Sequence, residues 1–376
     1  REVERKVSNI FKQRGFSEVI TPEIEFLDVF TLKEHDISTQ SMYKLSDRKG
    51  RLIALRPDST MPIARIVATR LKNYLLPIRL CYCQKVYRAN PSLRGRSDEI
   101  LQSGIEVIGA SNRRSDLEVI TTAVEVLNQL GTDDFRFELG HIAIFDRFME
   151  SLAIEEEIKE QIRWCIERKN YPALNDLLEE HLNSENVSIL KRLPQLFGGE
   201  EVFDEAIALF HNPDITETIE YLRSVYNNLA VLGLGNKITV DLGLVNRADY
   251  YSGIIFHGYI SGFGESVLSG GRYDHLISDF GVDLPAIGFA VNLNAVVSAV
   301  LEKGDTPKQQ LPDILLFSEP GYEMDGLLKA NELIAEGKRV EHSVFESKEE
   351  SREYAKKKGI RKLMVVSSET MTIELA

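Results

Sequence analysis

Ile78-Arg-Leu-Cys-Tyr-Cys-Gln-Lys-Val-Tyr87 and Leu101-Gln-Ser-Gly-Ile-Glu-Val-Ile108 are two largely apolar runs separated by a polar loop. Their length and composition predict two long β-strands. Because side chains alternate along a strand, Gln102, Gly104 and Glu106 face the same side. One strand face would therefore present an amide and a carboxylate, with a glycine between them that leaves room.

Further helices and strands surround this pair in the sequence. Apolar residues at helical spacing predict helices over 1–16, 62–74 and 115–130. Extended patterns predict a strand over 16–26 and a hairpin over 41–56. This mixture of elements indicates an α+β fold.

The pattern changes to uninterrupted helix between about residues 146 and 232, where isoleucine recurs every four residues at positions 154, 158, 162 and 166. Strand and glycine signals resume at 238, and a linker composition follows at 303–310. The tail alternates as βαβαβ. The predicted organisation is a core formed by 1–140 and 235–302, an all-helical insertion at 141–234, the linker 303–310 and a small α/β domain at 311–376.

Composition narrows the class of protein. The chain has 376 residues, of which 43% are hydrophobic and 27% charged, as is typical of a globular protein. No apolar run approaches the roughly 20 residues that a membrane span requires. The formal net charge is −13, so tRNA is an unlikely partner, because a protein that grips a phosphate backbone is usually basic.

The chain has three cysteines, Cys81, Cys83 and Cys165. An odd number without paired spacing indicates a reducing compartment, and we expect a cytoplasmic protein. Cys81 and Cys83 alternate within an apolar run, so we interpret them as strand packing residues. We expect no metal site and no cofactor.

Polar residues suited to a small zwitterion gather in three places. Each cluster taken alone is more typical of a helix cap, a surface ion pair or a core aromatic. Their order and spacing make them candidates for one binding site: Asp58 and Thr60; Arg88, Gln102 and Glu106; Tyr250 and Tyr251.

The combination resembles the class II aminoacyl-tRNA synthetase core, and histidyl-tRNA synthetase in particular. The segment 15–22 is similar to motif 1 with its interface proline Pro22, and Leu55-Arg-Pro-Asp-Ser-Thr60 resembles R-P-E-G-T. Residues 87–109 match motif 2. Leu244-Val-Asn-Arg-Ala-Asp-Tyr-Tyr251 resembles L-V-R-G-L-D-Y-Y, and the segments 270–274 and 285–290 resemble the approach to motif 3. The likeness covers about residues 1–300 and implies an antiparallel sheet with flanking helices, and the tail resembles a shortened anticodon-binding domain.

The resemblance implies that the amino-acid half of the site survives. Asp58, Thr60 and Gln102 match groups that hold the α-ammonium, and Arg88 matches the motif 2 arginine. Glu106 and Tyr251, beside Tyr250, match the groups that recognise the imidazole ring, whose two nitrogens both need partners. Asp58 stands where the family has glutamate, one methylene longer.

The nucleotide half departs from the synthetase pattern at four positions. Asn292-Leu293-Asn294-Ala295 stands where the family has G-L-E-R. The family's histidine-specific arginine falls at Asn246, and the motif 2 glutamate becomes Asn90. Arginines stabilise the charge that develops during adenylation, so we expect no catalytic residues here.

A core that keeps a histidine pocket and loses adenylation resembles the regulatory subunits of short-form ATP phosphoribosyltransferase. That resemblance implies a separate catalytic partner subunit, L-histidine as ligand, feedback inhibition by histidine and a homodimer formed through Pro22. Two alternatives are an active histidyl-tRNA synthetase and a synthetase-like scaffold without a ligand. The loop with Arg94 and Arg96 resembles the synthetase loop over ATP.

Overall fold

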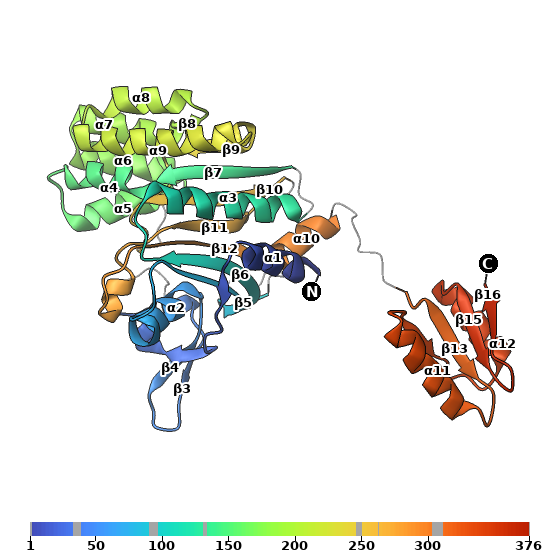
Figure 1. Ribbon diagram of the computed structural model, residues 1–376. Helices are drawn as coiled ribbons and strands as arrows, with labels where there is room; N and C mark the ends of the chain where they lie inside the picture. Colours follow the sequence, from blue (N-terminus) through green and yellow to red (C-terminus); the bar gives the residue numbers. More distant parts are fainter. Residues whose placement is uncertain are drawn as a thin grey trace. The chain divides into compact units, whose positions relative to one another are not determined.

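The computed structural model describes residues 2–32, 39–89, 97–130, 134–245, 250–261, 263–302 and 311–375 (Figure 1). The chain divides into two compact units, Arg1–Gly304 and Asp305–Ala376. The predicted linker 303–310 lies outside the described residues. No helix in the described ranges is long and apolar enough to cross a membrane.

The first unit is built on a mixed sheet that contains nine strands among the described residues. The prediction of an antiparallel sheet is corrected at both edges. The six consecutive strands from β5 to β7 are antiparallel, whereas β1 pairs with β5, and β9 with β7, in parallel. In spatial order the strands are β1 (Ser17–Glu18), β5 (Ile78–Tyr87), β6 (Glu99–Ile108), β12 (Ala286–Asn292), β11 (Ser266–Arg272), β10 (Ile254–Ile260), β7 (Phe135–His141), β9 (Ile238–Asp241) and β8 (Phe197–Gly198).

Helices α1 (Glu2–Gln13), α3 (Arg113–Gln129) and α10 (Leu293–Glu302) lie along this sheet (Figure 1). Their apolar faces share one core with the sheet. The helix α3 begins where the Asn112 side chain accepts hydrogen bonds from the backbone N–H groups of Arg114 and Ser115. This cap satisfies donors that the first turn of a helix leaves without partners.

The predicted strand over 16–26 divides into two short strands that belong to different sheets. After β1 the chain leaves the main sheet, and β2 (Ile24–Phe26) pairs with β4 (Leu52–Leu55) in a small sheet of order β2-β4-β3. The expected hairpin is confirmed by the antiparallel pairing of β4 with β3 (Lys44–Ser46). Pro22, which cannot donate to a ladder, lies in the break between the two strands. The short helices of this region are η1 (Leu27–Phe30), η2 (Thr39–Ser41), α2 (Thr60–Ile66), η3 (Val67–Leu71) and η6 (Ile277–Phe280).

Residues 141–234 form mostly helices, stacked beside β7 and β9 (Figure 1). The all-helical prediction is wrong at one point, because Phe197–Gly198 form the strand β8, which pairs with β9. Apolar residues of these helices and of the main sheet belong to the same core cluster. The elements are α4 (Ile142–Glu150), α5 (Glu156–Glu167), α6 (Tyr171–His181), α7 (Ser184–Arg192), η4 (Leu193–Gln195), α8 (Glu201–Phe210), α9 (Pro213–Val231) and η5 (Gly235–Lys237).

The second unit contains a four-stranded sheet of order β14-β13-β15-β16. The predicted βαβαβ pattern is present, and an antiparallel strand, β16, extends it. Two separate apolar clusters, one with α12 and one with α11, cover the sheet. The elements are β13 (Ile314–Ser318), α11 (Glu323–Ala335), β14 (Val340–His342), α12 (Lys348–Lys358), β15 (Lys362–Val366) and β16 (Met371–Glu374).

Candidate functional site

All seven residues singled out from the sequence line one pocket on the main sheet. The pocket encloses about 380 Å³ of space, part of which is open to solvent. Five further residues complete the lining. The full set is Asp58, Thr60, Arg88, Gln102, Glu106, Tyr250, Tyr251, Ser269, Tyr273, Gly288, Phe289 and Ala290.

Strand register places glycines opposite the large polar side chains of the pocket. Glu106 on β6 pairs with Gly288 on β12, which in turn pairs with Gly271 on β11. A Cβ atom at Gly288 would lie 1.6 Å from Glu106 Oε2, and one at Gly271 would lie 2.8 Å from the Tyr251 ring. The glycines therefore make the space that Glu106 and Tyr251 occupy.

Gly104 has a different role from the one expected. A Cβ atom there would lie 2.6 Å from the Tyr82 hydroxyl and 2.2 Å from the backbone oxygen of Phe289. The room that this glycine leaves between Gln102 and Glu106 is thus taken by the protein's own Tyr82 ring, which is 1% exposed.

Glu106 is the most deeply buried acid of the pocket, at 1% exposure. Its Oε1 atom accepts a hydrogen bond of 3.0 Å from Thr60 Oγ1, and its Oε2 atom accepts one from the Tyr273 hydroxyl. Burial raises the pKa of Glu106 to about 8, against the lowering effect of these two hydrogen bonds. At neutral pH this side chain can therefore hold a proton or pass it to a basic ligand.

Asp58 and Thr60 lie at the beginning of α2. Asp58 Oδ1 accepts a hydrogen bond of 3.0 Å from the backbone N–H of Met61, which fixes the carboxylate beside the pocket. The Thr60 hydroxyl donates its hydrogen bond to Glu106. This local turn brings a carboxylate and a hydroxyl, both suitable acceptors for an ammonium group, to one wall.

Gln102 carries an unused acceptor. Its Oε1 atom is buried and has no hydrogen-bond partner among the described residues. A buried polar atom without a partner costs about 1–3 kcal/mol. An N–H donor of a ligand would remove that cost, so this atom marks where a donor belongs.

Arg88 lies between this pocket and a second cavity of about 470 Å³, which shares Arg88, Gln102, Ser269 and Ala290 with it. Arg88 Nε donates to the backbone oxygen of Pro57 at 2.8 Å, which orients the guanidinium. Among the described residues that line the second cavity, Arg88 is the one cation. That wall offers a polyphosphate little positive charge.

Three tyrosines form the aromatic side of the pocket. The rings of Tyr250 and Tyr251 lie 4.9 Å apart, and the rings of Tyr250 and Tyr273 lie 6.0 Å apart in an edge-on arrangement. Burial raises the pKa of Tyr251 above its usual value, so its hydroxyl stays protonated at neutral pH. A flat aromatic ring with polar edges fits such a wall. Asp249 lies outside the described residues.

Tyr273 is a site residue that sequence reasoning missed. The segment 270–274 contains Tyr273, but the hydroxyl of this residue donates to Glu106 across 167 positions of the chain. The sequence offers one signal for Tyr273, the alternation of side chains beyond β11. Only the strand order β6-β12-β11, however, brings Tyr273 and Glu106 together.

The positions expected to have lost synthetase chemistry divide into two groups. Asn90 and Asn246 lie outside the described residues, as do Arg94 and Arg96. Asn294 Oδ1 accepts a hydrogen bond of 2.7 Å from the backbone N–H of Leu101. Ala295 is buried in the main core. Of the described residues, the linings of the two cavities include neither Asn294 nor Ala295.

Pro22 lies on an exposed extended segment that Arg56 holds in place. The Arg56 side chain, 2% exposed, donates to the backbone oxygens of Thr21 at 2.6 Å, Pro22 at 3.1 Å and Lys85 at 2.6 Å. Arg56 belongs to the same sequence motif as Asp58 and Thr60, but its guanidinium holds the backbone of neighbouring segments in place.

The rest of the described chain offers little competing chemistry. It contains no cluster of three or more His, Cys, Asp or Glu side chains that could hold a metal ion. His257 on β10 is partly buried, and burial lowers its pKa to about 4. It is therefore neutral at physiological pH.

Comparisons with known proteins show which proteins the chain resembles. The sequence profile of the family described as histidyl-tRNA synthetase matches residues 1–296. The chain is 39% identical to the ATP phosphoribosyltransferase regulatory subunit of Clostridium kluyveri, over 97% of this chain and 94% of that one. It is 38% identical to the ATP phosphoribosyltransferase regulatory subunit of Bacillus mycoides, over 98% of this chain and 88% of that one.

Two crystal structures are similar in fold. An ATP phosphoribosyltransferase regulatory subunit/histidyl-tRNA synthetase from Bacillus halodurans superposes with a TM-score of 0.82 at 27% identity, covering 91% of this chain and 87% of that one. Histidyl-tRNA synthetase from Nostoc sp. PCC 7120 has a TM-score of 0.79 at 20% identity, covering 99% of this chain and 92% of that one. The second likeness concerns the fold alone.

Proposed function

The chain belongs to the histidyl-tRNA synthetase-like family of ATP phosphoribosyltransferase regulatory subunits, and from this premise we propose that its pocket binds free L-histidine and thereby controls a catalytic partner subunit. It is a non-catalytic subunit that acts in histidine biosynthesis. The observation that carries the proposal is the single pocket that gathers Glu106, the tyrosines and the unused Gln102 acceptor.

Each part of histidine has a chemical counterpart in the pocket. The α-ammonium group lies against Asp58, Thr60 and Gln102, whose oxygens accept its three protons. The carboxylate pairs with the Arg88 guanidinium.

The imidazole lies between the tyrosines, and its two nitrogens meet Glu106 and the Tyr251 hydroxyl. Ligands that lack a ring nitrogen leave one of these buried groups without a partner. We therefore expect such ligands to bind about tenfold to a hundredfold more weakly.

The surroundings of the pocket favour a sensor over an adenylating enzyme. Adenylation needs several preorganised positive charges around the α-phosphate. The second cavity supplies Arg88, while the position after Asn294 carries the buried Ala295. The active synthetase expected as one alternative would need cations that these positions do not provide.

A homodimer through the segment around Pro22 is part of the proposal. Ile20, Pro22, Ile24 and Phe26 recur at every second position and are all exposed, with Ile20 at 80%. A contiguous exposed apolar strip of this kind is typical of a protein–protein contact. The motif 1 resemblance assigns that contact to a second copy of the chain.

A cytoplasmic location is also proposed. The cysteines Cys81, Cys83 and Cys165 are free thiols. Burial raises the pKa of both Cys81 and Cys83 to about 11, so neither forms a reactive thiolate at neutral pH. These are the thiols of a protein kept in a reducing compartment.

The test combines binding with regulation. L-Histidine is titrated into the purified chain by calorimetry, and the activity of the reconstituted complex with its catalytic subunit is measured with and without histidine. We expect Glu106→Gln to weaken binding and inhibition together, by about tenfold to a hundredfold, because a hydrogen bond to a charged group is lost.

Glu138→Gln is the matched control. Glu138 is a partly buried carboxyl on β7 of the same sheet, and burial raises its pKa too, but it lies outside the pocket lining. The Glu138→Gln variant should bind histidine as wild type does, and its complex should be inhibited by histidine to the same extent. If Glu106→Gln is inhibited as strongly as wild type, the pocket is idle and the scaffold alternative gains support.

A further inference from the structure

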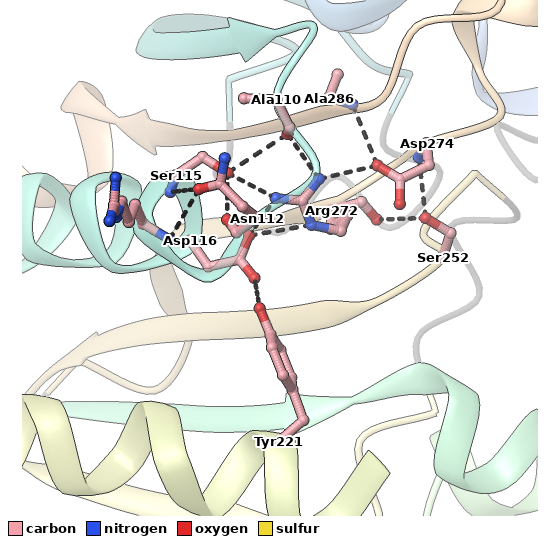
Figure 2. Close-up of polar contacts among 10 residues, drawn as sticks. Ala110, Asn112, Ser115, Asp116, Tyr221, Ser252, Arg272, Asp274 and Ala286 are labelled. Atoms are coloured by element: carbon pink, nitrogen blue, oxygen red, sulfur yellow. Dashed lines mark hydrogen bonds and ion pairs between the residues drawn. The ribbon is translucent and has the colours of Figure 1, made fainter. Parts of the chain in front are cut away.

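A buried ion pair between Arg272 and Asp116 is the centre of a polar network (Figure 2). Arg272, at the end of β11, is 7% exposed, and Asp116, in the first turn of α3, is 1% exposed. Arg272 Nε donates to Asp116 Oδ1 at 3.0 Å, and the neighbouring Nη2 donates to the same oxygen and to Ser115 Oγ at 2.9 Å. The guanidinium is therefore held in one orientation.

The remaining Arg272 donors reach the loops on either side. Nη1 donates to the backbone oxygen of Ala110 at 3.0 Å and to Asp274 Oδ1 at 2.9 Å. Asp274 in turn accepts from the backbone N–H of Ala286 on β12 at 3.2 Å. Every N–H-bearing nitrogen of this guanidinium has a partner, which is the condition for a stable buried cation.

This network is one residue away from the pocket. Tyr273, between Arg272 and Asp274, donates its hydroxyl to Glu106 and its backbone N–H to the oxygen of Ala286 at 2.8 Å. Ser252, which follows the pocket tyrosines, donates its N–H to the oxygen of Arg272 at 2.7 Å. The position of the Tyr273 ring therefore depends on how firmly Arg272 is anchored.

The opposite end of the network reaches the helical segment. The Tyr221 hydroxyl on α9 donates to Asp116 Oδ2, the oxygen that Arg272 does not use (Figure 2). The Tyr221 ring also packs edge-on against His141 at the end of β7, with 6.2 Å between ring centres. One carboxylate thus joins a residue beside the pocket to a helix of the segment 141–234.

We propose that Arg272, Asp116 and Tyr221 are positioning residues that couple occupancy of the pocket to helix α9. The inference rests on the proposed histidine binding and goes beyond it by naming the route. Without ligand, both oxygens of Glu106 are engaged, by Thr60 and by Tyr273. An imidazole that binds Glu106 at Oε2 shares this oxygen with the Tyr273 hydroxyl or displaces that hydroxyl, and the resulting shift is transmitted through the adjacent Arg272.

A network whose central ion pair, Arg272 with Asp116, is buried suits this task. Its members have fixed partners, so a change at one end is not absorbed by solvent. Coupling claims need a measured response at the far site, since spatial continuity alone is not evidence of coupling. The test therefore measures α9 directly.

The experiment follows hydrogen–deuterium exchange of the full chain with and without saturating L-histidine, after calorimetry has established the histidine affinity of each variant. In wild type we expect amides of α9 around Tyr221 to exchange at least about threefold more slowly with histidine. Helix α7, which lies outside the network, serves as the internal reference.

Tyr221→Phe should bind histidine within about twofold of wild type but lose at least half of the α9 response, because coupling residues need not touch the ligand. The matched control is Tyr226→Phe, the same change five positions along α9, where the ring packs on Phe203 instead. If Tyr221 had a merely structural role in α9, both variants would lose the α9 response to the same extent. Asp116→Asn should also lose the α9 response, and because it removes the counter-ion of the buried Arg272, it should weaken histidine binding as well.

The outcomes separate the two claims. If wild type binds histidine and α9 exchanges as before, the coupling is absent and the inference is wrong. The same holds if Tyr221→Phe keeps the α9 response of the Tyr226→Phe control. If calorimetry detects no histidine binding to wild type at all, the proposed function fails and the inference falls with it.

Discussion

At the scale of single residues, Glu106 shows how burial sets the chemistry of a carboxyl group. Its two oxygens are satisfied by Thr60 and Tyr273, yet its pKa is raised to about 8 because desolvation outweighs both hydrogen bonds. A group in this state exchanges a proton with an imidazole at little cost, since the ordinary pKa of histidine is about 6.5. In the proposed complex, Glu106 and the imidazole of histidine would therefore form a proton-sharing pair.

The pH dependence of histidine binding follows from that pair. The complex holds one proton between Glu106 and the imidazole. Below about pH 6.5 both groups are protonated before binding, so one proton must leave and the affinity falls as pH drops. Above about pH 8 neither is protonated, so a proton must be taken up and the affinity falls again.

Calorimetric titrations should thus show the highest affinity between about pH 6.5 and about pH 8, with up to about tenfold lost per unit beyond either limit. Glu106→Gln has no titrating carboxyl, so its profile should lose the fall at high pH. A wild-type affinity that keeps rising above pH 8 would contradict the shared proton.

Gly288 gives a second prediction at this scale. Gly288→Ala would place a Cβ atom 1.6 Å from Glu106 Oε2 and 2.5 Å from the backbone oxygen of Ile105, which cannot move away. We expect histidine binding to weaken by at least about tenfold, and the free energy of unfolding to fall by about 1–3 kcal/mol, as overpacked sites do. Calorimetry and urea unfolding measure the two effects.

The control for that substitution is Gly264→Ala. Gly264 is exposed, and an added Cβ atom would meet nothing within 4 Å. Both measurements should then match wild type. Normal histidine affinity in Gly288→Ala would mean that Glu106 does not contact the ligand from this side of the sheet.

At the scale of elements, the beginning of α10 shows how residues that differ from the synthetase pattern can stabilise the fold. Asn292 Oδ1 caps the helix by accepting from the backbone N–H of Ala295 at 3.1 Å. Asn294 then continues the hydrogen bonding of β6, because its side chain accepts from Leu101 just beyond the last β12 partner. The short polar side chains of Asn292 and Asn294 thus stabilise the fold through hydrogen bonds.

Asn294→Ala should therefore destabilise the chain without abolishing histidine binding. The backbone N–H of Leu101 loses its acceptor, which costs about 1–2 kcal/mol of unfolding free energy. Urea unfolding measures the loss, and the exposed Asn73→Ala is the control, expected within about 0.5 kcal/mol of wild type. An unchanged midpoint in Asn294→Ala would show that water replaces the side chain.

At the scale of the whole molecule, the two compact units have separate apolar cores. The pocket, its network and the helices of 141–234 all belong to the first unit, which contains two core clusters. The helices share one cluster with the main sheet, and Tyr273 of the pocket belongs to the other. The proposed dimer contact, around Pro22, is on that unit as well. Arg56 holds this segment against β5, and Arg88 of the pocket contacts Pro57. The neighbouring residues Arg56 and Pro57 therefore connect the proposed dimer contact with the pocket.

Ile20→Asp tests the dimer. A charge placed in the centre of the exposed strip around Pro22 should raise the dimer dissociation constant at least about tenfold, because an interface core tolerates unpaired charge poorly. Sedimentation equilibrium measures it. Leu75→Asp is the control, since Leu75 is 91% exposed but lies outside that strip. If Ile20→Asp leaves the dimer dissociation constant unchanged, the interface lies elsewhere on the chain.

Much of the site was predictable because its motifs are local. Arg88, Gln102 and Glu106 are carried by two neighbouring strands, and their alternation is visible in the sequence. The errors came where distant segments meet. The strand over 16–26 was expected to be continuous, but Thr21 bonds to Gln84 and the chain then turns into a second sheet. Likewise, the apolar period over 141–234 concealed β8, whose two residues are too few to change a pattern.

The amino-acid sequence was enough to predict how side chains alternate along each element, because periodicity depends on neighbours only a few positions apart. That was sufficient for most of the elements and for the seven candidate residues that line one pocket. Only the tertiary structure decided that Tyr273 meets Glu106, that Tyr82 fills the space at Gly104 and that Tyr221 reaches Asp116. These contacts depend on strand order and on packing between residues far apart in the chain, which local patterns do not encode.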